Sequence, residues 1–169
     1  EALAKLPSLK TLVLSKVSFD SLKAMHNLTA LEVLEVTADH RTNLSPLESL
    51  PEKVALKLHV DALGKVAGLE RLLSLVELDI RMGVRTNLSG AVGSEVFAGI
   101  ENLPNLTTLR LTNVKLTDLV DFAKLARLEE LSLYNCSLES LRGIEELRSL
   151  SKLVLNGNAI KSLKDLATM

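Results

Sequence analysis

Residues 106–160 read LTTLRLTNVKLTDLVDFAKLARLEELSLYNCSLESLRGIEELRSLSKLVLNGNAI, and this stretch decides the fold. One pattern of leucines starts at Leu106, again at Leu128 and again at Leu150, so its period is 22 residues. Within a copy the apolar positions keep the same offsets, as in Leu106, Leu109, Leu111 and Leu116. A fixed period of this length indicates a repeat array in which each unit buries its apolar side against the next.

The same phase extends toward the N-terminus through Leu75, Lys53, Leu31 and Leu9. Seven repeats starting at 9, 31, 53, 75, 106, 128 and 150 therefore fill residues 1–169 as a single array. The step from 75 to 106 is 31 residues, which predicts an insertion of nine residues within 83–103. Because the chain opens on Glu1 rather than Met, we expect it to be a fragment of a longer chain.

Each repeat contains a short segment in which apolar and polar residues alternate, the period of a β-strand. The segments recur in register, at 11–15, 33–37, 55–59, 77–81, 108–112, 130–134 and 152–156. The remainder of each repeat has an apolar residue at every third position, as at Leu63, Val66, Leu69 and Leu72. That spacing suits a tight helical or 3₁₀ return better than a long α-helix.

The pattern LxxLxLxxNxL resembles the 22-residue class of leucine-rich repeats, which includes a regulatory subunit of a protein phosphatase, a spliceosomal subunit and the bacterial internalins. The resemblance implies an α/β fold, a curved right-handed solenoid with a parallel concave β-sheet and short helical or 3₁₀ returns on the convex side. It also implies an asparagine in the turn after each strand, bonded to the backbone of a neighbouring repeat. Only Asn158 fits that place outright.

Charge and cysteine content restrict the class of partner and the compartment. Lysine and arginine number 20 against 21 acidic residues, for a net charge of -1, so no basic surface for nucleic acid is expected. Apolar runs are short and interrupted by charge, so we expect no insertion into a membrane. The single cysteine, Cys136, excludes an internal disulfide and favours a reducing, cytoplasmic location.

The strand alternation turns one set of polar side chains out to the concave face. The spacing predicts that Glu35, Lys57, Asp79 and Arg110 lie side by side on adjacent strands. Such opposite charges either neutralise one another on a solvated sheet or form a recognition patch, for which Tyr and Arg are favoured residue types. The predicted partner-binding residues are Glu35, Lys57, His59, Glu77, Asp79, Arg81, Arg110, Thr112, Glu130 and Tyr134.

No catalytic, metal-binding or cofactor-binding residues are predicted. His26, His40 and His59 fall in different repeats and show no spacing typical of metal ligands. Cys136 occupies the turn after a strand, where we expect it to be buried and unreactive. The sequence therefore predicts no enzyme and no cofactor.

The functional prediction is a scaffold that binds a protein partner through the concave sheet, with the partner and the oligomeric state left open. One alternative is a secreted or cell-surface ectodomain for adhesion or ligand recognition. It depends on five N-x-S/T sequons, which start at Asn27, Asn43, Asn87, Asn105 and Asn135. Another alternative is a structural spacer between flanking domains.

Overall fold

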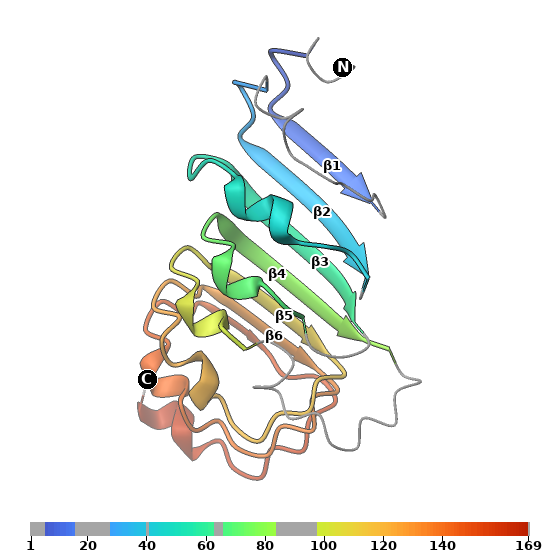
Figure 1. Cartoon of the computed structure of the whole chain (residues 1–169). Coiled ribbons are helices and arrows are strands. Elements are labelled where there is room, and N and C mark those ends of the chain that lie inside the picture. The colour runs from blue at the N-terminus through green and yellow to red at the C-terminus, as the bar shows by residue number, and fades with distance from the viewer. Residues whose placement is uncertain (1–5, 16–27, 40, 63–65, 84–97, 169) are drawn as a thin grey trace.

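The structure is a computed structural model, and it describes residues 6–15, 28–39, 41–62, 66–83 and 98–168 (Figure 1). In this part of the chain seven parallel strands form one sheet, in the order in which they occur along the chain. The strands are β1 (Thr11–Ser15), β2 (Val33–Asp39), β3 (Ala55–Ala62), β4 (Leu75–Met82), β5 (Thr108–Thr112), β6 (Glu130–Tyr134) and β7 (Lys152–Val154). The prediction of a repeat solenoid with a parallel sheet is confirmed.

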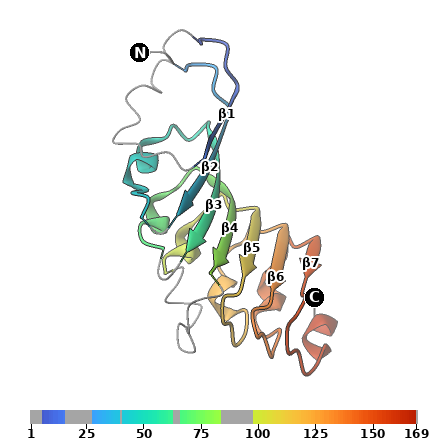
Figure 2. The same cartoon turned by 90° about the vertical axis from the view of Figure 1, so that its right-hand side faces the viewer.

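The segments that return from one strand to the next contain short 3₁₀ turns. These are η3 (Ser45–Ser49), η4 (Leu69–Arg71), η5 (Ile100–Asn102), η6 (Val120–Phe122), η7 (Ile144–Glu146) and η8 (Lys164–Thr168). They lie on one face of the sheet, while the strands follow one another like steps (Figures 1 and 2). The return of the first repeat at 16–27 and most of the predicted insertion, at 84–97, lie outside the described residues.

The core lies between the sheet and the returns. Apolar side chains of neighbouring strands stand opposite one another in rows, one of which is Leu14, Val36, Leu58, Leu78, Leu109, Leu131 and Leu153. Leu58, Leu78, Leu109 and Leu131 are fully buried, whereas Leu14 and Leu153 at the two ends are only partly buried. Burial of one leucine stabilises the fold by about 1.5–3 kcal/mol, so each repeat depends on its neighbours.

The strands of the N-terminal half are longer than the repeat predicts. β2, β3 and β4 continue to Asp39, Ala62 and Met82, two or three residues further in β2 and β3 and one residue further in β4. Alternation is the reason, because Ala38, Val60, Ala62 and Met82 continue the buried side of the pattern. β7 is shorter than predicted and ends at Val154.

The strands of the C-terminal half end in a different turn. Asn113 and Asn135 directly follow β5 and β6 with φ angles of 60° and 53°, and Gly157 has the equivalent place with 70°. These left-handed residues turn the backbone out of the sheet. Asn158 then bonds the preceding repeat, as the resemblance implies. Its Oδ1 accepts from the N–H groups of Cys136 and Leu138, and its Nδ2 donates to the carbonyl of Leu133.

The register between β3 and β4 departs from the 22-residue spacing. Lys57 stands opposite Glu77, and Leu56 stands opposite Leu75, so Val76 is an extra residue in β4. The turn before β3 is also adjusted, because Val54 fills the buried place that the repeat assigns to Lys53, and Lys53 is exposed. Its amino group instead donates to the carbonyl of Thr29.

Candidate functional site

All ten predicted partner-binding residues lie on β2–β6, at the alternating positions that face away from the leucine core. Most are partly exposed, whereas Asp79 is buried and Arg81 is well exposed. Strand positions rather than loops therefore set where these side chains lie, which gives the concave face a defined arrangement of charge.

The predicted order of charges across the face is wrong at one boundary. Because paired residues of β3 and β4 lie 20 positions apart here instead of 22, Lys57 is level with Glu77 rather than Asp79, and Asp79 is level with His59. Glu35 beside Lys57 and Asp79 beside Arg110 are as predicted. The predicted single row therefore divides into two groups of charged residues.

The first group is a chain of ion pairs that runs from β3 to β7. Lys57 Nζ lies 3.0 Å from Glu77 Oε2, and Arg110 bonds the other oxygen of Glu77. Arg110 also lies 3.6 Å from Glu130, whose Oε2 is 3.3 Å from the amino group of Lys152. We call Lys57, Glu77, Arg110, Glu130 and Lys152 the ion-pair chain. Its members satisfy one another, which supports the interpretation of neutralising pairs for this part of the face.

Glu77 is the centre of the ion-pair chain, with its side chain only 17% exposed. Burial by itself would raise the pKa of this carboxyl group, but the bonds from Lys57 and Arg110 outweigh it and hold the pKa below its ordinary value. Glu77 therefore stays charged at neutral pH and joins β3 to β5.

The second group surrounds His59. Its Nδ1 lies 3.5 Å from Asp79 Oδ2 and its Nε2 lies 3.8 Å from Glu35 Oε1. Arg81 covers the buried Asp79 from the other side, with Nη2 2.8 Å from Oδ2, and the bond to Asp79 raises the pKa of Arg81. These residues, with Thr37, Val60 and Asp61, line a hollow of about 260 Å³ that we call the His59 hollow.

Thr112 and Tyr134 lie beyond the two charged groups. They stand opposite each other on β5 and β6, and Thr112 is also level with Arg81 on β4. Both side chains are partly exposed. The face thus changes from charged on β2–β4 to neutral and aromatic at the ends of β5 and β6.

Two residues of the concave face were missed by the sequence analysis. Asp39 and Asp61 have the place of the turn asparagine in the repeat pattern, but they belong to β2 and β3 and stand opposite each other. The continued alternation in VLEVTAD and ALKLHVDA was a signal that could have identified them. Lys152, the last member of the ion-pair chain, was not among the predicted site residues either.

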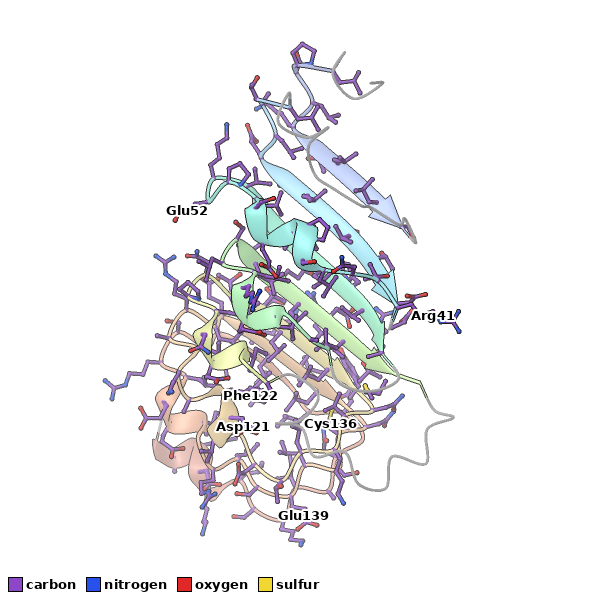
Figure 3. All side chains as sticks on the ribbon, in the orientation of Figure 1. Arg41, Glu52, Asp121, Phe122, Cys136 and Glu139 are labelled. Atoms are coloured by element: carbon purple, nitrogen blue, oxygen red, sulfur yellow. The ribbon has the colours of Figure 1, made fainter. Side chains whose placement is uncertain are left out.

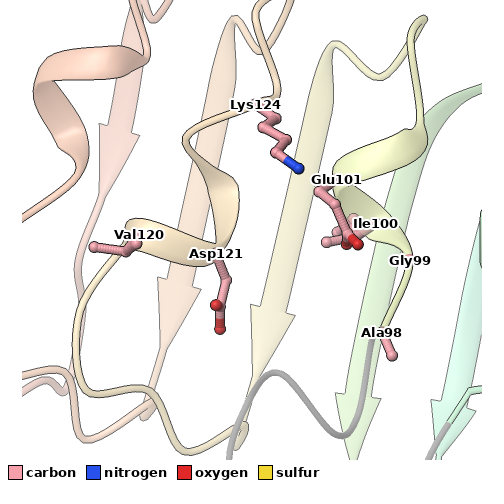
Figure 4. A pocket seen from close by; sticks show the side chains of 7 residues that line it. All are labelled: Ala98, Gly99, Ile100, Glu101, Val120, Asp121 and Lys124. Carbon is pink, nitrogen blue, oxygen red and sulfur yellow. The ribbon is translucent and has the colours of Figure 1, made fainter.

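A second hollow, of about 310 Å³, lies on the convex side between η5 and η6 (Figure 4). It is lined by Ala98, Gly99, Ile100, Glu101, Val120, Asp121 and Lys124, the first four of which belong to the region of the predicted insertion. Burial raises the pKa of Asp121, and the charges of Asp118 and Glu101 add to the effect. The hollow therefore holds carboxylates that repel one another.

Histidine, cysteine and carboxylate side chains are the groups that could bind a metal ion or act in catalysis. Among the described residues no three His, Cys, Asp or Glu side chains are grouped closely enough to hold a metal ion; His26 and His40 lie outside these residues. Cys136 is fully buried beside the core, as predicted (Figure 3), and burial raises the pKa of its thiol. In the same part of the chain, no helix has the length and apolar character needed to cross a bilayer.

Comparison with known proteins identifies the repeat. Residues 126–168 match the family described as leucine-rich repeats in two copies. No curated protein sequence matches the chain significantly. An internalin of Listeria monocytogenes is 19% identical with a TM-score of 0.62, and the match covers 98% of this chain and 47% of that one.

Two further solved structures share the fold. Internalin C2 of Listeria monocytogenes is 22% identical with a TM-score of 0.62, covering 98% of this chain and 79% of its own. A leucine-rich repeat protein of Leptospira interrogans is 22% identical with a TM-score of 0.66, covering 98% and 42%. The chain thus spans less than half the length of two of these three structures. Identities this low establish the fold and not a shared ligand.

Proposed function

Since the chain is a leucine-rich repeat protein, we propose that it is a non-enzymatic scaffold that binds a protein partner through the concave face of its sheet. The observation that carries this proposal is the ordered set of polar side chains on β2–β6, held in place by mutual ion pairs and backed by a fully buried leucine core. A preformed surface loses little conformational entropy on binding.

The residues expected to contribute most are Arg81, Arg110 and Tyr134. Arginine and tyrosine are enriched among the residues that dominate protein interfaces. In this chain they lie on three consecutive strands, and Arg81 is the most exposed cation of the His59 hollow. The partner would therefore span β4, β5 and β6.

The test is affinity capture from an extract of the native source, followed by mass spectrometry. The test variant is Arg81→Glu/Arg110→Glu/Tyr134→Ala. The matched control is Lys115→Glu/Arg148→Glu/Leu73→Ala, which makes equivalent changes at exposed residues off the concave face. Circular dichroism and thermal unfolding must first show that both variants fold.

We expect a protein that wild type and control retain and that the concave variant loses. Retention of the same proteins by all three would contradict the proposal. It would favour the spacer alternative, in which the concave side chains are dispensable, or the convex hollow beside Gly99 and Val120.

For the compartment we propose the cytoplasm, with a secreted or cell-surface ectodomain as the alternative. Asn105 supports the first choice, because its Nδ2, the atom that would carry a glycan, donates to the carbonyl of Leu73. Asn43 is exposed and supports the alternative. A glycosidase-sensitive mass shift in protein from the native source would decide for the ectodomain.

A further inference from the structure

The two halves of the concave face differ in charge. The strands β2, β3 and β4 carry five acidic side chains and two basic ones, a net charge of -3 with His59 neutral. The strands β5, β6 and β7 carry one acidic and two basic side chains. The acidic residues of the first half are Glu35, Asp39, Asp61, Glu77 and Asp79.

The cations of β3 and β4 do not balance this excess. Lys57 stands opposite Glu35 in the sheet, but its amino group pairs with Glu77 on the other side. Arg81 is bonded to Asp79. Within the described part of the chain, no lysine or arginine forms an ion pair with Glu35 or Asp61. Both carboxylates line the His59 hollow.

We propose that the His59 hollow receives a cationic side chain, an arginine, of the protein partner. This inference rests on the proposed function and adds the chemistry of the partner. A guanidinium group is planar and donates in several directions, so it can bond Glu35 on β2 and Asp61 on β3 while Thr37 accepts from it. It supplies the positive charge that β2–β4 lack.

Protonation of His59 opposes this binding. The ring faces Glu35 and Thr37 from β2 and Asp79 and Arg81 from β4, with Lys57 and Asp61 on its own strand. A charged imidazole between Glu35 and Asp79 supplies a cation from within the chain, which competes with the partner's arginine for Glu35.

The test uses a fluorescein-labelled peptide with two arginines separated by glycine, and the full chain. A second peptide has citrulline, the neutral isostere, in place of arginine, and a third has glutamate. Fluorescence anisotropy measures affinity for wild type and for Glu35→Gln/Asp61→Asn. The matched control is Glu52→Gln/Glu129→Gln, which removes two charges from exposed side chains outside the sheet (Figure 3 shows Glu52).

We expect the arginine peptide to bind about tenfold more tightly than the citrulline peptide. Glu35→Gln/Asp61→Asn should remove that preference, and the control should keep it. Equal affinity for arginine and citrulline, equal losses in both variants, or preference for the glutamate peptide would overturn the inference.

The same variants separate this inference from the proposed function. Suppose that a captured partner is lost by the Arg81, Arg110 and Tyr134 variant but retained by Glu35→Gln/Asp61→Asn. The concave face is then the binding surface and the arginine in the His59 hollow is wrong. If the first variant still retains every partner, the proposed function itself fails.

Discussion

The N-terminal strands β2–β4 and the C-terminal strands β5–β7 build one sheet in two ways. In the C-terminal half the strands have five residues or fewer and two of them end at a left-handed asparagine. In the N-terminal half they have seven or eight residues, and their last polar positions, Asp61 and Arg81, are level with Thr112 of β5. The family match at 126–168 falls wholly in the regular half. The two halves thus differ in how their strands end, while the row of side chains at this edge of the concave face runs on from one half to the other.

On the convex side the glycines before the 3₁₀ turns differ in how closely the neighbouring repeat approaches them. Gly68, before η4, and Gly143, before η7, both have a left-handed backbone, with φ of 85° and 99°. A Cβ atom at Gly68 would meet nothing within 4 Å. At Gly143 it would lie 2.7 Å from the backbone nitrogen of Val120 in the preceding repeat. At Gly99, before η5, it would lie 2.5 Å from Cβ of Glu70, so Gly99 and Gly143 are required for their small size as well as their conformation, and Gly68 only for its conformation.

The largest effect is expected from Gly143→Ala. Its free energy of unfolding should fall by about 2–4 kcal/mol, because backbone strain is added to a contact that backbone atoms cannot relieve. Gly68→Ala is the matched control and should cost only about 1 kcal/mol, the strain alone. Urea unfolding of both variants measures the difference. Equal costs would show that the close approach of Val120 at Gly143 adds nothing to the backbone strain.

The next effect concerns the turn asparagine. Asn158→Ala leaves the N–H groups of Cys136 and Leu138 without their acceptor, so we expect a loss of about 1–3 kcal/mol in the free energy of unfolding. Asn156→Ala, an exposed asparagine in the same turn, should change it by less than about 0.5 kcal/mol. Similar losses in both variants would mean that the side-chain hydrogen bonds of Asn158 contribute little to the stability of the C-terminal half.

Most of the fold could be predicted from the sequence, because each strand carries its own period-two signal and the repeat fixes its neighbours. β1, β5 and β6 have the predicted bounds. The register shift between β3 and β4 could not be predicted, since in the sequence Leu56 and Leu78 keep the 22-residue spacing of the repeat. The continuation of β2 and β3 was missed because Asp39 and Asp61 also suit a turn.

The sequence predicted which side of the sheet the candidate site residues lie on, but not all of the ion pairs that they form. Alternation placed all ten residues on the concave side. Which charge meets which depends on register, and a shift of two residues moves Lys57 from Asp79 to Glu77. It also brings His59 beside Asp79 and so forms the His59 hollow. Whether these residues bind a partner stays a prediction.

A smaller effect on stability is expected from the ion pairs of Glu77, which join the N-terminal and C-terminal halves of the sheet. Glu77→Gln weakens the contacts to Lys57 on β3 and Arg110 on β5, and we expect a loss of about 1 kcal/mol at neutral pH, discounted for partial exposure. Because the pKa of Glu77 is lowered in the fold, this stabilisation is present above the ordinary value of 4.5 and is lost as the pH falls through the lowered pKa.

The free energies of unfolding of wild type and Glu77→Gln should therefore become equal as the pH falls. Urea unfolding of both proteins across this acid range measures the difference between them. Glu52→Gln, exposed and outside the network, is the control and should show no pH-dependent difference from wild type. A gap that stays constant through the acid range would mean that the glutamate contributes by packing rather than by charge.

The smallest effect is expected at Asp121. This residue lines the convex hollow between η5 and η6, where the N-terminal and C-terminal halves meet. Burial, Asp118 and Glu101 raise the pKa of Asp121, so its charged form is disfavoured in the fold and costs stability at neutral pH. Because Asp121 is exposed, the effect is discounted, and Asp121→Asn should raise the free energy of unfolding by at most about 0.5 kcal/mol at neutral pH. The gain should shrink as the pH falls through the raised pKa, because wild type then becomes neutral as well. A lower free energy of unfolding for Asp121→Asn at neutral pH would contradict this prediction. It would show that Lys124, which lines the same hollow, attracts the Asp121 carboxylate and so stabilises the contact between η5 and η6.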